Sequence, residues 1–219
     1  MKRNINLNEI SDGKLYSEND MVRVGCNDCK GCSACCKGMG ESVILDPLDI
    51  YRLCQHLKTS FQVLLAAHVE LGVVDGVILP HLKMTGPKEA CSFLNAEGRC
   101  KIHTSRPGIC RLFPLGRYYE NGSFRYFLQT RECAKTNRTK VKVSKWIDTP
   151  DLVQNREFVI RWHYFLNHCE ELVSRHEDDE YRKNLNMLVL NLFYIKPYDL
   201  NCDFYPQFYE RMQQIEQVL

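Results

Sequence analysis

The chain has 219 residues, of which 44% are hydrophobic and 26% are charged. This composition is ordinary for a folded protein, and a chain of this length can bury an adequate core without a metal or disulfide staple. The formal net charge of +2 excludes strong overall attraction to nucleic acid or to an anionic membrane. The longest apolar run, residues 63–67, is too short to span a bilayer. We therefore expect no nucleic-acid partner and no membrane association.

The amino terminus carries two basic residues but no apolar segment behind them, so we predict no secretory signal and a cytoplasmic location. In a reducing compartment, the twelve cysteines favour metal binding or reactivity over disulfide bonds. The function of the chain is therefore expected to depend on these thiols.

The first 72 residues are expected to form a polar lead-in, a short strand and two helices. Residues 1–25 are polar and predict a poorly ordered or loosely docked lead-in. Residues 42–45 (SVIL) indicate a short strand. Asp46 and Pro47 then begin a helix, as an N-cap and a first-position proline. A second helical segment covers residues 61–70 and ends at Gly72.

Residues 73–128 have the pattern of β-structure. A hairpin is expected to bring Cys91 and Cys100 together through the turn at residues 95–98. The clearest hairpin has Asn121-Gly122 as its type I′ turn. Residues 135–145 contain five basic side chains and no acidic one. We expect this segment to be a solvated connector, although a basic strip beside a site could attract an anionic ligand.

The rest of the chain indicates helices that begin near Thr149, span residues 179–194 and run from Pro206 to the carboxyl terminus. We predict an α+β fold: a small cysteine-rich, metal-bound core with β-hairpins packed against helices, plus a C-terminal helical subdomain. The expected division is a polar N-terminal lead-in (1–25), a cysteine-cluster metal-binding domain (26–145) and a C-terminal helical cap (146–219).

The cysteines fall into three groups by their surroundings. Those on apolar helical or aromatic segments are expected to be small buried hydrophobes: Cys54, Cys169 and Cys202. A proximal set lies within eleven residues: Cys26, Cys29, Cys32, Cys35 and Cys36. A distal set is spread over the β-region: Cys91, Cys100, Cys110 and Cys133.

The two-residue spacing within the proximal set lets a tight turn direct several sulfurs at one ion or cluster. Cys29, Cys32 and Cys35 match the three-ligand run of 4Fe–4S proteins, which then take a remote fourth cysteine. Zinc is the direct competitor, but structural zinc sites favour two such pairs, and this chain has them on one side only. The spacing therefore favours an iron–sulfur cluster over Zn²⁺ and leaves both open.

His103 follows Cys100 by three residues and could be a ligand or a base, although a lone histidine on a hairpin is more often a hydrogen-bonding residue. Paired catalytic carboxylates, a phosphate-binding loop and a dinucleotide-binding fingerprint are absent from the sequence.

Four blocks of this sequence, taken together, resemble the CxxCxxCC family of zinc- or iron-chelating proteins. The resemblance is carried by residues 29–36 (CKGCSACC), 43–53 (VILDPLDIYRL), 91–114 (CSFLNAEGRCKIHTSRPGICRLFP) and Cys133. It implies eight metal ligands: Cys29, Cys32, Cys35, Cys36, Cys91, Cys100, Cys110 and Cys133. Cys26 and His103 are weaker candidates. Because adjacent side chains diverge, Cys35 and Cys36 are expected to serve different sites, or one of them to serve chemistry.

One activity in the broader family is methylation of flagellin lysines by an iron–sulfur enzyme that uses S-adenosylmethionine. The resemblance to that enzyme is confined to the cysteine module, and it implies a possible protein or peptide substrate. Candidate catalytic groups are Arg106, Arg111 and Cys36; the arginines could offset thiolate charge or hold an anionic group, or make salt bridges inside the fold. The alternative is a zinc-binding structural or interaction module, or a metal carrier, without catalysis.

Overall fold

The computed structural model describes residues 6–27 and 32–219. Its first half alternates short strands and helices: α1 (Leu7–Ile10), β1 (Ser11–Tyr16), β2 (Met21–Gly25), the 3₁₀ turn η1 (Ala34–Cys36), α2 (Pro47–Leu57), α3 (Phe61–Ala67), β3 (Val69–Val74), β4 (Val77–Leu82), β5 (Met84–Thr85) and β6 (Ala90–Cys91). The second half becomes helical: η2 (His103–Ser105), α4 (Gly108–Leu112), β7 (Leu115–Glu120), β8 (Ser123–Gln129), β9 (Thr139–Lys142), α5 (Val143–Ile147), α6 (Leu152–Arg175), α7 (Asp179–Leu190), the short π-helix η3 (Asn191–Ile195) and α8 (Phe204–Glu216). The predicted α+β class is confirmed.

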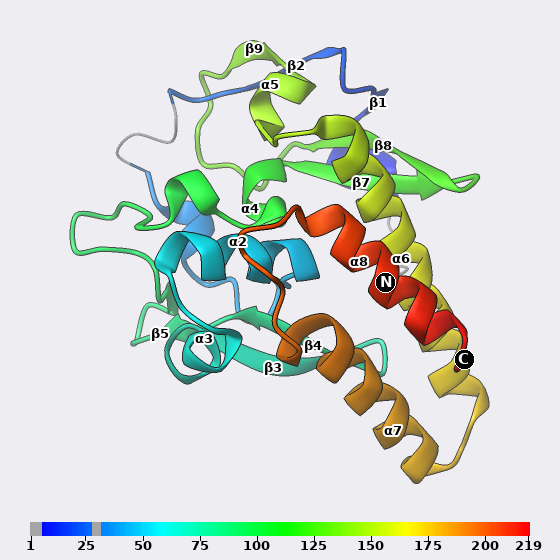
Figure 1. Ribbon diagram of the computed structural model, residues 1–219. Helices are drawn as coiled ribbons and strands as arrows, with labels where there is room; N and C mark the ends of the chain where they lie inside the picture. Colours follow the sequence, from blue (N-terminus) through cyan, green and yellow to red (C-terminus); the bar gives the residue numbers. More distant parts are fainter. Residues whose placement is uncertain (1–5, 28–31) are drawn as a thin grey trace.

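The strands form small antiparallel sheets (Figure 1). One has the order β1-β8-β7, and three are two-stranded: β2-β9, β3-β4 and β5-β6. The β7–β8 hairpin turns through Asn121 and Gly122, both with positive φ (51° and 71°), as a type I′ turn requires. This hairpin, the one most clearly indicated by the sequence, is confirmed.

The prediction that residues 1–25 are loosely docked is wrong for residues 6–25. Strand β1 pairs with β8, and β2 pairs with β9. Val22 and Val24 are 1% and 0% exposed. Strand β2 buries Val22 and Val24 at alternate positions, and this alternation is too short to stand out in the sequence.

Three other expectations need correction. Residues 42–45 form a single bridge, between Ile44 and His81, rather than a strand. The helix predicted over residues 61–70 ends at Ala67, because the chain from Val69 pairs with β4. Residues 135–145 are more than a connector, since they include β9 and the start of α5.

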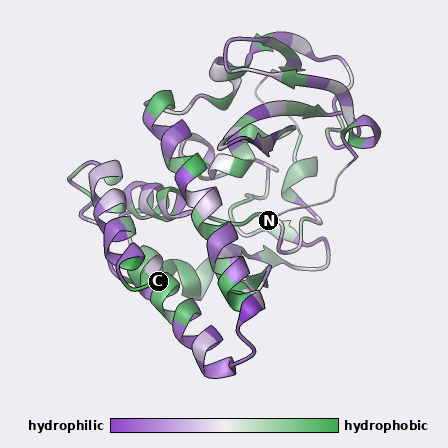
Figure 2. Ribbon diagram, turned by 90° about the vertical axis from the view of Figure 1, so that its right-hand side faces the viewer, coloured by the Kyte–Doolittle hydropathy of each residue, from purple (hydrophilic) through white to green (hydrophobic). Residues whose placement is uncertain are grey.

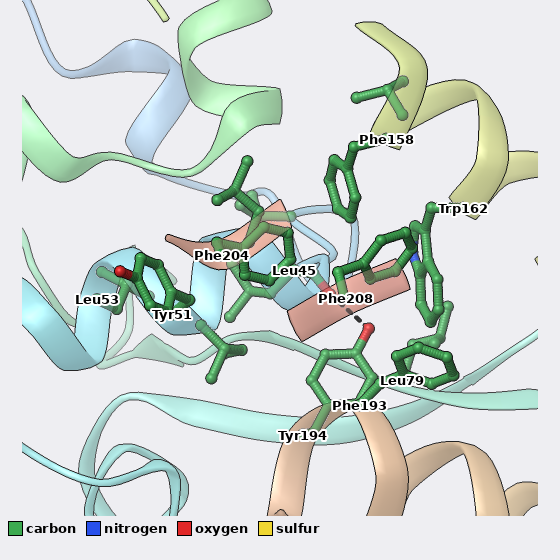
Figure 3. Close-up of a cluster of buried hydrophobic side chains, with 14 of the residues drawn as sticks. Leu45, Tyr51, Leu53, Leu79, Phe158, Trp162, Phe193, Tyr194, Phe204 and Phe208 are labelled. Atoms are coloured by element: carbon green, nitrogen blue, oxygen red, sulfur yellow. Dashed lines mark hydrogen bonds between the residues drawn. The ribbon is translucent and has the colours of Figure 1, made fainter. Parts of the chain in front are cut away.

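The helices predicted in the last third are present, and they belong to the same core as the strands. Figure 2 shows hydrophobic and hydrophilic colour alternating along each long helix, as amphipathic packing requires. Aromatic side chains from α6, η3 and α8 interlock in Figure 3: Phe158, Trp162, Phe193, Phe204 and Phe208. The hydroxyl of Tyr194 donates a hydrogen bond to the backbone oxygen of Leu45 (3.1 Å), which fastens these helices to the segment before α2. The division at residues 145 and 146 stays a prediction, and the two parts share one hydrophobic cluster.

Of the helices in the described ranges, none combines the length and the apolar character needed to cross a membrane.

Replacing Val24 by Ala tests whether the amino-terminal strand is part of the core. We expect the free energy of unfolding to fall by about 2 kcal/mol, because two buried methyl groups are lost and a small cavity remains. Chemical denaturation under anaerobic conditions measures the change. Met21→Ala is the matched control on the same strand, because Met21 is 53% exposed and should cost less than about 0.5 kcal/mol. Equal effects of the two variants would contradict the inward orientation of Val24.

Candidate metal centre

The end of the proximal cysteine run is held beside the distal run by backbone pairing. Lys37 forms an antiparallel bridge with Ala90, and the amide of Gly38 donates to the carbonyl oxygen of Glu89 (2.9 Å). Gly38 has φ +66°, a conformation that favours glycine. The pairing places Cys36, at the end of η1, next to Cys91 of β6.

Cys100 returns to the same place through a tight turn. The amide of Gly98 donates to the Asn95 carbonyl (3.0 Å), and the Asn95 side chain accepts from the amide of Arg99 (2.7 Å). One bridge, between Leu94 and Cys100, closes the loop. The predicted approach of Cys91 and Cys100 is present. The pairing is less regular than in a full hairpin, because the Asn95 side chain accepts a hydrogen bond from the backbone of the turn.

Cys110 is positioned by an aspartate from a distant helix. Asp46 and Asp49 form a capping box at the start of α2, in which the Asp46 carboxylate accepts from the Asp49 amide (2.8 Å) and the Asp49 carboxylate from the Asp46 amide (3.2 Å). The other oxygen of Asp49 accepts from the amide of Gly108, the first residue of α4, at 2.7 Å. Cys110 lies two residues further on. Asp49 therefore couples α2 to the turn that presents Cys110.

Asp49 is 3% exposed. Burial and, after it, the neighbouring Asp46 carboxylate raise its pKa to about 8, against the lowering effect of the Gly108 amide. The role of Asp46 as a cap was predicted from the sequence, whereas the hydrogen bond between Asp49 and Gly108 was not. The motif D-P-x-D signals the capping box, but nothing in it identifies a partner 59 residues away.

Five thiols are close enough to influence one another's pKa: Cys35, Cys36, Cys91, Cys100 and Cys110. Burial is the largest cause of the raised pKa values of Cys91, Cys100 and Cys110. A hydrogen bond from the Cys36 thiol is the largest cause that lowers the pKa of Cys35 to about 7, and the Arg106 guanidinium contributes to the same lowering. The same hydrogen bond raises the pKa of Cys36. The folded chain thus gathers five sulfur donors, and burial favours the protonated form of Cys91, Cys100 and Cys110.

This donor set suits a thiophilic metal. Zinc and iron–sulfur clusters both take cysteine thiolates, and a bound metal deprotonates the thiols that ligate it. Across residues 6–27 and 32–219, no three His, Cys, Asp or Glu side chains already converge as ligands of a single ion. Cys29 falls outside the described residues. The described donors therefore fit the metal by chemical type.

The other predicted ligands occupy different places. Cys26 and Cys32 line the same cavity as the five thiols. Among the described residues, Cys133 is half-buried and is not part of the cavity lining. Of the cysteines expected to be buried hydrophobes, Cys54 and Cys169 are buried; Cys202 is exposed, and its thiol donates to the Asp199 carboxylate (3.2 Å). That last expectation was wrong because Cys202 lies in the loop before α8 rather than on the packed face of a helix.

The two candidate arginines differ in what they can do. Arg111 is 6% exposed, and its guanidinium donates to the carbonyl oxygens of Arg106 (3.1 Å), Asp148 (2.9 Å) and Thr104. These bonds make Arg111 a backbone brace around α4. Arg106 is half-buried and lies beside Cys35 and Cys100, where its positive charge lowers the pKa of both thiols. One of its nitrogens is within 3.1 Å of both ring nitrogens of His103.

The cavity extends well beyond the thiols. Its volume is about 1850 Å³, and Arg106 and His103 line it next to the cysteines. Away from the cysteines it is lined by Arg117, Tyr119 and His163, of which Tyr119 and His163 stack with ring centroids 3.5 Å apart.

A family model, CxxCxxCC, described as "Putative zinc- or iron-chelating domain", matches residues 28–143, more than half of the chain. The chain belongs to the CxxCxxCC family. The match contains the whole thiol cluster and Asp49, and it ends at the first residue of α5. The resemblance predicted from four sequence blocks is confirmed, and so is its coarse functional content, a cysteine domain that chelates zinc or iron. Comparisons with curated proteins and with solved structures found no match.

Replacing Asp49 by Ala should weaken metal binding although Asp49 is no ligand. The turn that carries Cys110 loses its anchor, and the loss of such supporting contacts typically costs about tenfold or more in metal affinity. The measurement is competition for the metal with a chelator under anaerobic conditions.

Asp178→Ala is the matched control for this prediction. Asp178 caps a helix, α7, by accepting from the amide of Glu180 (2.9 Å), far along the chain from the cysteines that line the cavity. Asp178→Ala should lose about 1 kcal/mol of stability with its cap, and Asp49→Ala should lose more, because two backbone amides lose their partner. Metal affinity equal in Asp49→Ala and Asp178→Ala would show that the Asp49–Gly108 hydrogen bond does not support the site.

Proposed function

We propose that the cysteine cavity holds a 4Fe–4S cluster. The observation that carries this proposal is the number of thiols in one place: five interact with one another, and Cys26 and Cys32 line the same cavity. A structural zinc ion needs four ligands in a closed tetrahedron. A 4Fe–4S cluster is larger, and it takes thiolates from a tight cysteine loop together with a remote cysteine. The cysteine run of the sequence at residues 29–36 and the segment around Cys91, Cys100 and Cys110 would supply these two parts.

The charge around the thiols also supports a cluster. A cluster with four thiolate ligands carries net negative charge, which buried surroundings disfavour unless a cation lies nearby. Arg106 lies beside Cys35 and Cys100, and Arg99 beside Cys100. Free thiols of this kind persist in a reducing compartment, so we place the protein in the cytoplasm.

Anaerobic purification followed by absorption spectroscopy and metal analysis tests the cluster. We expect a brown protein with a broad band near about 400 nm and about four iron and four sulfide per chain. Colourless protein with one zinc per chain would instead support the alternative, a zinc-binding structural module, interaction domain or metal carrier without catalysis.

Single substitutions locate the ligands. Cys110→Ala should lose most of the bound metal, because this thiol lies within the cluster of five. Cys169→Ala is the control: this cysteine is 0% exposed in the helical core, away from the cavity lining, so the variant should keep its metal in spite of a small packing defect. Retention of full metal content by Cys110→Ala would contradict the assignment.

We further propose that the protein transfers a methyl group from S-adenosylmethionine to a lysine of a protein or peptide. This rests on the family resemblance and on the size of the cavity, since about 1850 Å³ exceeds both the needs of a metal centre and the usual volume of a small-molecule pocket. In such a reaction the neutral lysine nitrogen attacks the methyl carbon, the carbon–sulfonium bond breaks, S-adenosylhomocysteine leaves and the nitrogen releases a proton to water. Arg106 remains a candidate for holding an anionic group. Arg111 is not, because its donors are bound to backbone carbonyls.

Incubation of the anaerobically purified protein with S-adenosylmethionine and lysine-containing proteins tests this step. Mass spectrometry should find peptides heavier by one methyl group on lysine, and Arg106→Gln should reduce the yield. Failure of the protein to bind S-adenosylmethionine, with its cluster intact, would reject methyl transfer and leave the metal centre standing.

A further inference from the structure

The two-stranded ribbon of β2 and β9 has one buried face and one charged face. Val22 and Val24 are buried, so the alternate residues Met21 and Arg23 face outward. The strands pair with Met21 opposite Lys142 and Arg23 opposite Lys140. Because directly opposed side chains share a face of the sheet, the outer face consists of Met21, Arg23, Lys140 and Lys142.

This arrangement places two positive charges directly across from each other. Like charges at opposed positions of an antiparallel pair destabilise it. The acidic residues nearest along β2 have other partners: Glu18 pairs with Arg156 (3.5 Å), and Asp20 accepts from the amide and hydroxyl of Ser17 (2.6 and 2.8 Å). Within the described ranges of the chain, no carboxylate forms an ion pair with Arg23, Lys140 or Lys142. The ribbon therefore keeps an unfavourable charge pair that an external anion would relieve.

The ribbon also adjoins the thiol cavity. Gly25 of β2 and Thr139 and Val141 of β9 contribute to its lining, and Lys145 of the following α5 does so as well. In Figure 1, β2, β9 and α5 lie together at one end of the molecule. Thr139 and Val141 alternate with Lys140 and Lys142, so the cavity adjoins the inner face of the ribbon, and a chain bound along the outer face would lie on the opposite side of the same two strands.

The dimensions and chemistry of this face select one class of anion. The paired strands are four to five residues long, about 13–17 Å at ~3.3 Å per residue, which matches a short extended peptide. Nucleic acid is a poorer fit, because the net charge of the chain is only +2 and the outer face has no aromatic side chain on which a base could stack. Met21, 53% exposed, adds an apolar contact at one end.

We propose that the outer face of the β2–β9 ribbon docks an acidic segment of a protein partner, in which carboxylates pair with Arg23, Lys140 and Lys142 and an apolar residue contacts Met21. The partner is bound by this face whether or not the cysteine site carries a cluster. The charges of this face set the chemical class of the protein partner, whether or not the protein transfers methyl groups.

Fluorescence anisotropy with the full-length, anaerobically purified protein tests this docking face. The probe is a labelled peptide of alternating Glu and Gly with one Leu. The references are the same peptide with Gln for Glu and a labelled single-stranded DNA of equal charge. We expect the acidic peptide to bind more tightly than either reference, with an affinity that falls as salt rises. Tighter binding of the DNA, or equal binding of the Gln peptide, would overturn the proposal.

Charge-removing variants locate the face. The triple variant Arg23→Gln, Lys140→Gln and Lys142→Gln should weaken binding of the acidic peptide about tenfold or more. The control variant Lys88→Gln, Lys183→Gln and Lys196→Gln removes the same charge from exposed positions elsewhere and should bind as the unchanged protein does. An equal loss in both variants would show attraction to overall charge and overturn the assignment. The absorption spectrum should be the same in the unchanged protein and in both triple variants. A change in the spectrum would reveal loss of the cluster, which is thereby distinguished from loss of peptide binding.

Discussion

The cysteine site depends on the buried carboxylate of Asp49. One oxygen closes the capping box of α2, and the other accepts from the Gly108 amide at 2.7 Å. The Asp49 side chain lies in the low-dielectric interior. Loss of either hydrogen bond would therefore leave a buried amide without a partner, which costs more free energy than the bond itself contributes. The carboxylate therefore holds α2 and α4 in one relative position. Cys110 is presented from α4, so the location of one thiol is decided by a helix that carries no predicted ligand.

Burial of the thiols has a further consequence for the domain. Raised pKa values at Cys91, Cys100 and Cys110 mean that the folded chain disfavours thiolates in the absence of a compensating cation. A metal centre reverses this balance because it binds thiolates directly. Arg106, next to Cys35 and Cys100, offsets only part of the charge. The site and its metal therefore support each other, whereas Arg111 contributes through the backbone it braces.

The helical third of the chain supports this site from outside. Its aromatic residues from α6, η3 and α8 pack as one cluster, and Tyr194 ties that cluster to Leu45, immediately before the capping box. Because an interior is packed at nearly crystalline density, displacement of these helices would be transmitted to α2. This packing gives the carboxyl-terminal helices, which lie outside the family match, a structural connection to the cysteines.

Several features could be predicted from local sequence because local physics decides them. Asn121-Gly122 accepts the positive φ of a type I′ turn, Asp46-Pro47 caps and begins a helix, and the stripe of Phe158, Trp162 and Phe165 has helical spacing. The family and the metal-binding character followed from cysteine spacing, since few structures need that density of thiols. The amino-terminal strands were missed because the partners of β1 and β2 lie more than a hundred residues further along the chain.

The sequence by itself determined the fold class, the family, and the type of donor in the site, because these depend on composition, spacing and turn chemistry. Only the tertiary structure decided which thiols meet, that Asp49 anchors the turn of Cys110, that Arg111 is a brace and Arg106 is not, and that Arg23 faces Lys140. Each of these depends on hydrogen bonds or pairings between segments far apart in the chain, and no local pattern encodes which distant group will be the partner.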